Sequence, residues 1–134
     1  MIIVSACLAG YKCRYNGQSA HCPRVPSLVR YKKAIAVCPE ILAGLSTPRT
    51  LVEKVNGKFI GKDGKDYTKA FIKGANQALK IAELAGCKKA ILKSKSPSCG
   101  FGQIYDGTFT GGLKRGNGIF AEKLKKAGIK IESI

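Results

Sequence analysis

Short runs of hydrophobic residues, rich in isoleucine, valine and alanine, recur along the chain without the strict alternation of a half-exposed strand. Such runs are typical of strands that are buried on both faces of a parallel sheet. Turn-forming residues or helical stretches separate each run from the next. The predicted strands cover residues 2–6, 33–37, 89–93 and 129–131.

Residues 67–85 have a helical period instead. The apolar positions from Phe71 to Ala82 share one face, and lysines occupy the others, which predicts an amphipathic helix. Asp66 precedes this segment as a candidate N-cap, and Gly86 follows it as a candidate helix end. Shorter helices are predicted within residues 23–31 and 119–127.

The alternation of strands and helices predicts a single α/β domain over residues 1–134. We expect a Rossmann-like fold, with a mostly parallel sheet flanked by helices. Weak alternation over residues 51–59 around Asn56-Gly57 predicts a small hairpin. The glycine-rich residues 107–118 lack both the P-loop and the dinucleotide-binding patterns.

Charge adds a second feature, because 24 Lys and Arg residues stand against 8 Asp and Glu residues, for a formal net charge of +16. A field of this sign attracts nucleotides and RNA. Lysines dispersed along a chain are also typical of a solvated surface, and RNA-recognition motifs with aromatic residues are absent. No apolar run approaches the roughly 20 residues that span a bilayer, and no secretory leader is evident. We therefore expect a cytoplasmic protein without a membrane partner.

Three of the six cysteines stand where predicted strands end. Cys7 and Cys38 directly follow two strands, and Cys99 lies in the loop after a third. Because the carboxyl ends of parallel strands meet at one edge of a sheet, we expect these thiols to converge. Thiolates in a reducing compartment bind zinc or an iron–sulfur cluster. The lack of a closely paired zinc knuckle favours the cluster, and three thiolates would leave one iron open for chemistry.

The other three cysteines have different expected roles. Cys13 shares a loop with Cys7 and is a candidate fourth ligand, sulfur carrier or supporting residue. Cys22 follows His21, the single histidine, but adjacent residues rarely point the same way, so a catalytic Cys–His pair is not favoured. Cys87 is expected to pack in the core.

Polar residues beside the cysteines are candidates for catalysis. Glu40 follows Cys38 by two residues and is either a general base or a charge at the surface or at a helix start. Ser96 and Ser98 flank Pro97 just before Cys99. Their hydroxyls could contact a ligand or cap the turn.

Taken together, these motifs resemble the thiouracil desulfurase (TudS-like) family over nearly the whole chain. A departure is Asn16, where the family often has aspartate, and another is the unusually basic composition. The motifs are residues 5–10 (SACLAG), 13–17 (CRYNG), 37–40 (VCPE), 44–49 (GLSTPR), 90–93 (AILK), 96–100 (SPSCG) and 104–109 (IYDGTF).

The resemblance implies a 4Fe-4S cluster held by Cys7, Cys38 and Cys99, with one iron not bound by protein. It implies that this iron takes the sulfur of a thiolated pyrimidine while a water activated by Glu40 attacks the carbon, so that hydrosulfide leaves. Ser96 matches the family serine that contacts the base. The implied substrate is a thiolated base, a thiouridine nucleotide or 4-thiouridine in tRNA.

Two other functions stay open at this point. A component of tRNA thiolation would carry sulfur in the opposite direction, although the chain shows no P-loop-like motif for ATP. A non-enzymatic zinc module would bind RNA through its lysines. The substrate's size, the role of Cys13 and the oligomeric state are not determined by the sequence.

Overall fold

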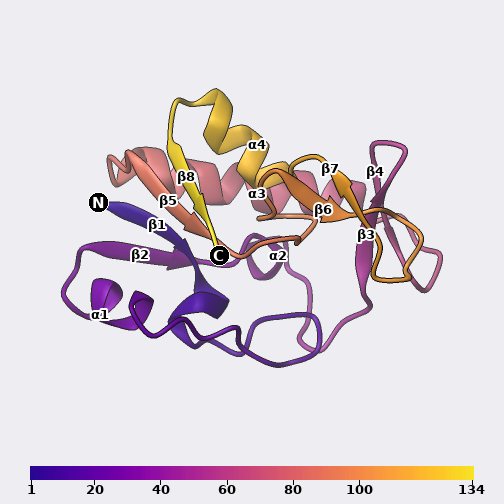
Figure 1. Ribbon diagram of the computed structural model, residues 1–134, viewed down its shortest axis with the longest axis horizontal. Helices are drawn as coiled ribbons and strands as arrows, with labels where there is room; N and C mark the ends of the chain where they lie inside the picture. Colours follow the sequence, from indigo (N-terminus) through magenta and orange to yellow (C-terminus); the bar gives the residue numbers. More distant parts are fainter.

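A four-stranded, entirely parallel sheet forms the centre of the fold in the computed structural model, which describes residues 1–134 (Figure 1). The α/β fold with a mostly parallel sheet is therefore confirmed. The first predicted strand is one residue shorter than expected, and the last runs two residues further. The strands, in their order across the sheet, are β2 (Ala34–Val37), β1 (Ile2–Ser5), β5 (Lys89–Leu92) and β8 (Lys130–Ser133).

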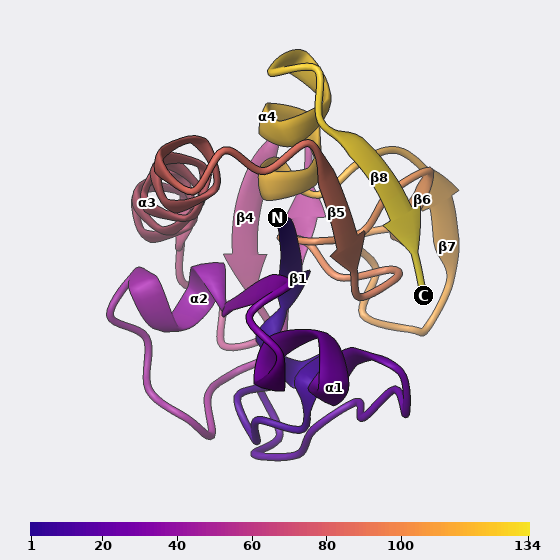
Figure 2. The same ribbon diagram turned by 90° about the vertical axis from the view of Figure 1, so that its left-hand side faces the viewer.

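Helices cover both faces of the sheet. The helices α3 (Thr68–Leu84) and α4 (Ile119–Lys126) pack on one face, in the larger core cluster with residues of β1, β2 and β5. The opposite face packs against α1 (Val25–Arg30) and the single 3₁₀ turn η1 (Ala6–Ala9). Figure 2 shows α1 on the far side of β1 and β5 from α3 and α4.

The long helix α3 forms as its period predicts. Its buried positions include Phe71 and Ala75, and Ala82 continues the same face. The N-cap residue is Tyr67 and not Asp66 as predicted. The Asp66 carboxylate nevertheless accepts a hydrogen bond from the backbone N–H of Thr68 at 2.8 Å, which satisfies a donor at the helix start. Gly86, with φ of 68°, turns the chain out of the helix.

Two small hairpins lie beyond the carboxyl ends of the parallel strands (Figure 1). Asn56 and Gly57 both have positive φ, at 50° and 78°, as a two-residue hairpin turn requires. The second hairpin was not predicted, because its strands have three residues each and the second of them lies within the glycine-rich segment. The strands are β3 (Val52–Val55) with β4 (Lys58–Gly61), and β6 (Gln103–Tyr105) with β7 (Leu113–Arg115).

A four-residue helix, α2 (Pro39–Leu42), was also not predicted. It begins directly after β2, with Pro39 at its first position, where a missing N–H costs nothing. Four residues are too few to show a hydrophobic period, and packing against α3 stabilises the helix instead. None of the helices has both the length and the hydrophobicity needed to cross a membrane.

Candidate functional site

The ends of β1, β2 and β5 open onto one cavity of about 90 Å³. Cys7, Cys38 and Cys99 line it together, although they are far apart in the sequence. This confirms the expected convergence of the three thiols at the carboxyl edge of the sheet. Cys13 lines the same cavity and brings a fourth thiol to it.

Each thiol at a strand end is held by a different local structure. Cys7 is buried in η1, immediately after β1. Cys38 has extended backbone angles and forms the N-cap of α2. Cys99 is 5% exposed in the loop after β5, where the Ser96 hydroxyl oxygen accepts its backbone N–H at 2.9 Å and that of Ser98 at 3.0 Å. Ser96 therefore caps the turn that presents Cys99.

The surroundings of three of the cavity thiols raise their pKa values. The Cys38 thiol donates a hydrogen bond to the backbone oxygen of Cys13 at 3.9 Å. The neighbouring Cys38 thiol lowers the pKa of Cys13, but the Cys7 thiol and burial outweigh this effect and raise that pKa to about 11. The neighbouring Cys13 thiol raises the pKa of Cys38, and burial raises the pKa of Cys99. A metal group that binds to these three thiols must therefore displace their protons.

The donor set fits an iron–sulfur cluster better than a single metal ion. No three His, Cys, Asp or Glu side chains are close enough together to hold one ion. Four cysteines instead surround a shared cavity, as a multi-iron group with ligands at separate corners requires. The zinc interpretation therefore gains no support from the geometry.

Glu40 lies in the first turn of α2 and points into the same cavity. Its Oε1 accepts a hydrogen bond from Arg49 Nε at 3.0 Å, and its Oε2 accepts one from the Ser98 hydroxyl at 3.0 Å. The side chains of Glu40 and Arg49 are only 15% and 8% exposed. The carboxylate is thus held in one orientation by charge-assisted contacts.

The sequence assigned no role to Arg49, yet its guanidinium connects three segments around the cavity. Besides Glu40, it donates to the backbone oxygen of Cys13 at 2.8 Å. It also donates to the Ser46 backbone oxygen at 3.2 Å and to the Thr47 hydroxyl at 3.0 Å. In the sequence, Arg49 appears only as the last residue of the motif at residues 44–49. Its role could not be predicted, because its partners come from separate segments that only the fold brings together.

The rest of the polar lining is mainly basic. Arg14, Arg49 and Lys93 line the cavity, with Glu40 as the single carboxylate among the lining residues. Burial, followed by the neighbouring Arg14, lowers the pKa of the Lys93 ammonium group. This arrangement favours an anionic ligand or a ligand with several acceptor atoms.

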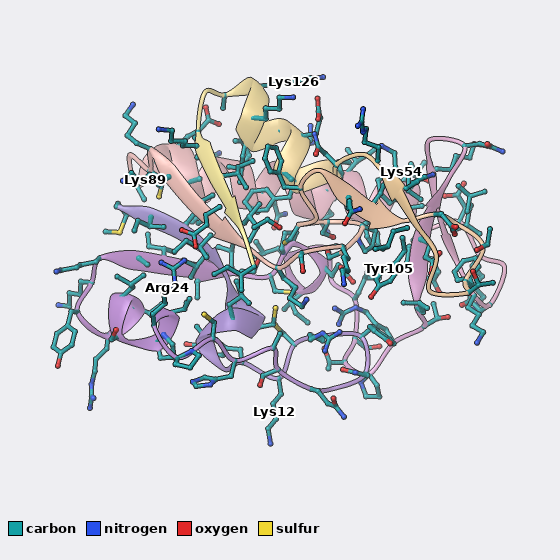
Figure 3. The ribbon with its side chains drawn as sticks, in the orientation of Figure 1. Lys12, Arg24, Lys54, Lys89, Tyr105 and Lys126 are labelled. Carbon is teal, nitrogen blue, oxygen red and sulfur yellow. The ribbon has the colours of Figure 1, made fainter.

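Most of the remaining positive charge is spread over the surface. Figure 3 shows Lys12, Lys89 and Lys126 pointing into solvent on different sides of the molecule. The dispersed pattern is that of a solvated surface, one of the two interpretations of the composition. Tyr105, the last residue of β6 and just before the glycine-rich segment, also lines the cavity.

Two other cysteines lie outside the cavity, as expected. Cys87 is 4% exposed within the larger core cluster. Cys22 is half-buried and packs against the cluster around η1 and α1, while His21 is exposed. No catalytic pair is formed between Cys22 and His21.

Comparison with known proteins shows which family this site belongs to. The 2-thiouracil desulfurase family matches residues 2–133. The chain belongs to this family. Its sequence is 42% identical to the uncharacterized protein YbbK of Bacillus subtilis (strain 168), over 99% of this chain and 95% of that protein. The fold is similar to that of the [4Fe-4S]-dependent thiouracil desulfidase TudS, with a TM-score of 0.93 and 40% identity over 98% of this chain and 89% of that one.

Proposed function

We propose that this protein is a 4Fe-4S-dependent desulfidase that removes sulfur from a thiolated pyrimidine and releases it as hydrosulfide. The reaction is a hydrolysis of the C=S bond without net oxidation or reduction. The observation that carries the proposal is the convergence of Cys7, Cys38 and Cys99 beside Glu40 in one cavity. Membership of the 2-thiouracil desulfurase family and the likeness to TudS support it.

The ligands in this proposal are the three cysteines at strand ends. Cys7, Cys38 and Cys99 hold the cluster, and one iron has no ligand among them. When bound, the cluster supplies a Lewis acid that prefers sulfur donors to oxygen donors. That preference selects a thiocarbonyl over the ordinary carbonyl of a pyrimidine.

Glu40 is the proposed general base that takes a proton from the attacking water. A carboxylate has about four acceptor positions, so the contacts to Arg49 and Ser98 leave room for a water to donate to it. The same contacts fix the direction in which the proton is taken. Positioning of this kind is a large part of what a general base contributes.

Ser96 is the proposed contact to the base. Its oxygen already accepts two backbone N–H groups. A hydroxyl has one proton to donate and two acceptor positions, so the proton of Ser96 is left for a partner in the cavity. An oxygen or a ring nitrogen of a pyrimidine is such a partner.

The substrate carries this base either free, as a nucleotide or within tRNA. Arg14 and Lys93 in the cavity lining, together with the net charge of +16, favour a substrate with a phosphate. We place the reaction in the cytoplasm, where six free cysteines and an oxygen-sensitive cluster are maintained in the reduced state.

Anaerobic reconstitution followed by iron and sulfide analysis tests the proposal. We expect about four irons and four sulfides per chain, and sulfide release from 2-thiouracil, thiouridine monophosphate or thiolated tRNA. Cys99→Ala is expected to lose bound iron, whereas Cys22→Ala, outside the cavity, is expected to keep it. Stoichiometric zinc without inorganic sulfide, or a full cluster without sulfide release from any of the three substrates, would overturn the proposed function.

A further inference from the structure

Ser5 is a buried polar side chain to which the proposed function gives no role. It is 2% exposed and lines the same cavity as the three proposed ligands. The other two buried polar side chains have clear partners, because Glu53 accepts backbone N–H groups and Ser98 donates to Glu40. A hydroxyl removed from water costs free energy unless it is hydrogen-bonded. The partners of the Ser5 hydroxyl therefore indicate what the residue does.

Ser5 lies at the carboxyl edge of the sheet, where the proposed ligands converge. It is the last residue of β1, which lies between β2 and β5. On one side it pairs with Val37, the residue before Cys38. On the other side, the backbone N–H of Lys93 donates to Ser5 Oγ at 3.0 Å. Cys7 follows Ser5 by two residues, so the hydroxyl is held between the segments that carry the ligands.

The proton of this hydroxyl has no partner among the oxygens and nitrogens of the chain. Ser5 takes part in one side-chain hydrogen bond, as the acceptor of the Lys93 N–H. A serine hydroxyl has one proton to donate besides its two acceptor positions. Because the side chain is buried and lines the cavity, this proton is available to a group inside the cavity.

Cys99 is the proposed ligand that most needs such a donor. Its side chain is 5% exposed and belongs to the larger hydrophobic core cluster. A thiolate buried in apolar surroundings is costly unless hydrogen bonds stabilise its charge. The adjacent Ser98 hydroxyl donates to Glu40 instead. Burial raises the pKa of the Cys99 thiol, whereas the Ser5 side chain lowers it.

We propose that Ser5 donates its hydroxyl proton to the Cys99 thiolate when the cluster is bound. Hydrogen bonds to the sulfurs of a cluster draw electron density from its irons and are one of the factors that set its reduction potential. A more electron-poor cluster is a stronger Lewis acid toward the sulfur of the substrate. Ser5 thus acts through Cys99 and does not touch the substrate. This inference rests on the proposed function, since it assigns a donor to one of the proposed ligands.

The midpoint potential of the reconstituted cluster tests this inference without an activity assay. We expect Ser5→Ala to keep about four irons per chain and to have a lower midpoint potential than wild type. Ser5→Thr keeps a hydroxyl and should have the wild-type potential. Ser27→Ala, at an exposed position of α1, is the control. Thermal melting of the cluster-free variants checks that each still folds.

Resonance Raman spectra of the wild-type holoprotein give a second measurement that does not depend on a variant. A hydroxyl proton exchanges for deuterium, so we expect the iron–cysteine stretching bands to shift in D₂O. The shift should be smaller in Ser5→Ala, which has one donor fewer. Bands that do not respond to D₂O in the wild type overturn the inference, even where Ser5→Ala fails to fold.

The two proposals fail in different ways. A four-iron holoprotein that releases sulfide, but has the same midpoint potential in Ser5→Ala as in wild type, overturns the role of Ser5 and leaves the desulfidase intact. A potential of Ser5→Thr as low as that of Ser5→Ala does the same. The expected shift in potential without sulfide release overturns the proposed function and leaves the hydrogen bond to Cys99 intact. A protein that binds no cluster overturns both proposals.

Discussion

Arg49 illustrates how one side chain organises this cavity. Its guanidinium has five N–H donors in a rigid plane, and they reach Glu40, the Cys13 backbone and the loop at Ser46 and Thr47. The single cation therefore orients the proposed base and anchors the loop that carries Cys13. Lysine has the same charge but cannot reproduce this geometry.

Arg49→Lys is therefore expected to impair both the fold and the chemistry. Hydrogen bonds to charged groups contribute roughly 1.5–3 kcal/mol each, so we expect the free energy of unfolding of the cluster-free protein to fall by about 2 kcal/mol, as measured by urea denaturation. We also expect kcat to fall, because Arg49 orients the proposed base Glu40. Arg24→Lys, on the exposed surface, is the matched control, and equal behaviour of the two variants would contradict the role given to Arg49.

Glu40→Gln separates catalysis from cluster binding. The amide is nearly the same size but cannot take a proton, so we expect kcat to fall by about 100-fold or more. The iron and sulfide content should be unchanged, because the cysteines are intact. Glu83→Gln, exposed on α3, is the control. Full desulfidation by Glu40→Gln would remove Glu40 from the mechanism.

The short helix α2 has its position because α3 lets it approach closely. A Cβ atom added at Gly74 of α3 would lie 1.9 Å from the backbone oxygen of Pro39 and 3.0 Å from the Ala43 side chain. Gly74 is itself buried. The glycine therefore sets the depth at which α2 presents Glu40 to the cavity.

Gly74→Ala is expected to destabilise the protein, although the same change in an exposed helix stabilises by up to about 1 kcal/mol. Forcing α2 away from α3 should cost about 1–3 kcal/mol and lower kcat by displacing Glu40. The melting temperature and sulfide release measure the two effects. Asn76→Ala, exposed on the same helix, should be neutral or stabilising, and a stabilised Gly74→Ala would show that α2 is not held in this way.

A buried carboxylate holds the glycine-rich segment against β3. Glu53 is 2% exposed, and its Oε1 accepts the backbone N–H groups of Gly107 at 3.0 Å and Phe109 at 3.1 Å. The segment that follows β6 and its Tyr105 is thereby tied to the first hairpin. This contact joins two elements that the sequence analysis treated separately.

Glu53→Ala would leave these two partly buried donors without their acceptor. Each such loss costs about 1–3 kcal/mol, so we expect the free energy of unfolding to fall by about 2–5 kcal/mol in urea denaturation. Glu53→Gln keeps a carbonyl oxygen that can accept the same two N–H groups and should retain most of the stability. Equal loss in both variants would mean that the charge, and not the acceptor, matters.

Over the whole molecule, the positive charge affects encounter with the substrate more than the chemistry. The net charge of +16 is spread over many surface lysines, and only Arg14, Arg49 and Lys93 line the cavity. Exposed charges are screened by salt beyond about 10 Å at moderate ionic strength. A long-range field of this kind acts on the rate at which an anion arrives.

The value of kcat/KM for thiouridine monophosphate is therefore expected to fall as salt rises from low to physiological concentration. The value for 2-thiouracil, which brings no phosphate, should change little over the same range and serves as the control. Steady-state kinetics at several salt concentrations check this. Identical salt dependence for the two substrates would show that the positive charge has no part in substrate capture.

Much of this fold follows from local pattern. The hydrophobic runs of β1, β2 and β5 and the helical period of α3 are set by neighbouring residues, and the sequence predicts them to within one residue or so. The convergence of Cys7, Cys38 and Cys99 followed as well, because parallel strands bring their carboxyl ends to one edge. The elements it missed, α2 and the β6–β7 hairpin, have at most four residues each in a helix or strand.

The sequence by itself determined the sheet, the long helix and three of the four thiols as a group. Only the tertiary structure decided how the cavity is lined: Glu40 meets Ser98, 58 residues away, and Arg49 meets Cys13, 36 residues away. Local propensity acts over a few neighbouring residues, whereas these hydrogen bonds require loops from different strand ends to be brought together first. The partners of the proposed base and the place of Cys13 in the cavity lining are therefore properties of the folded chain.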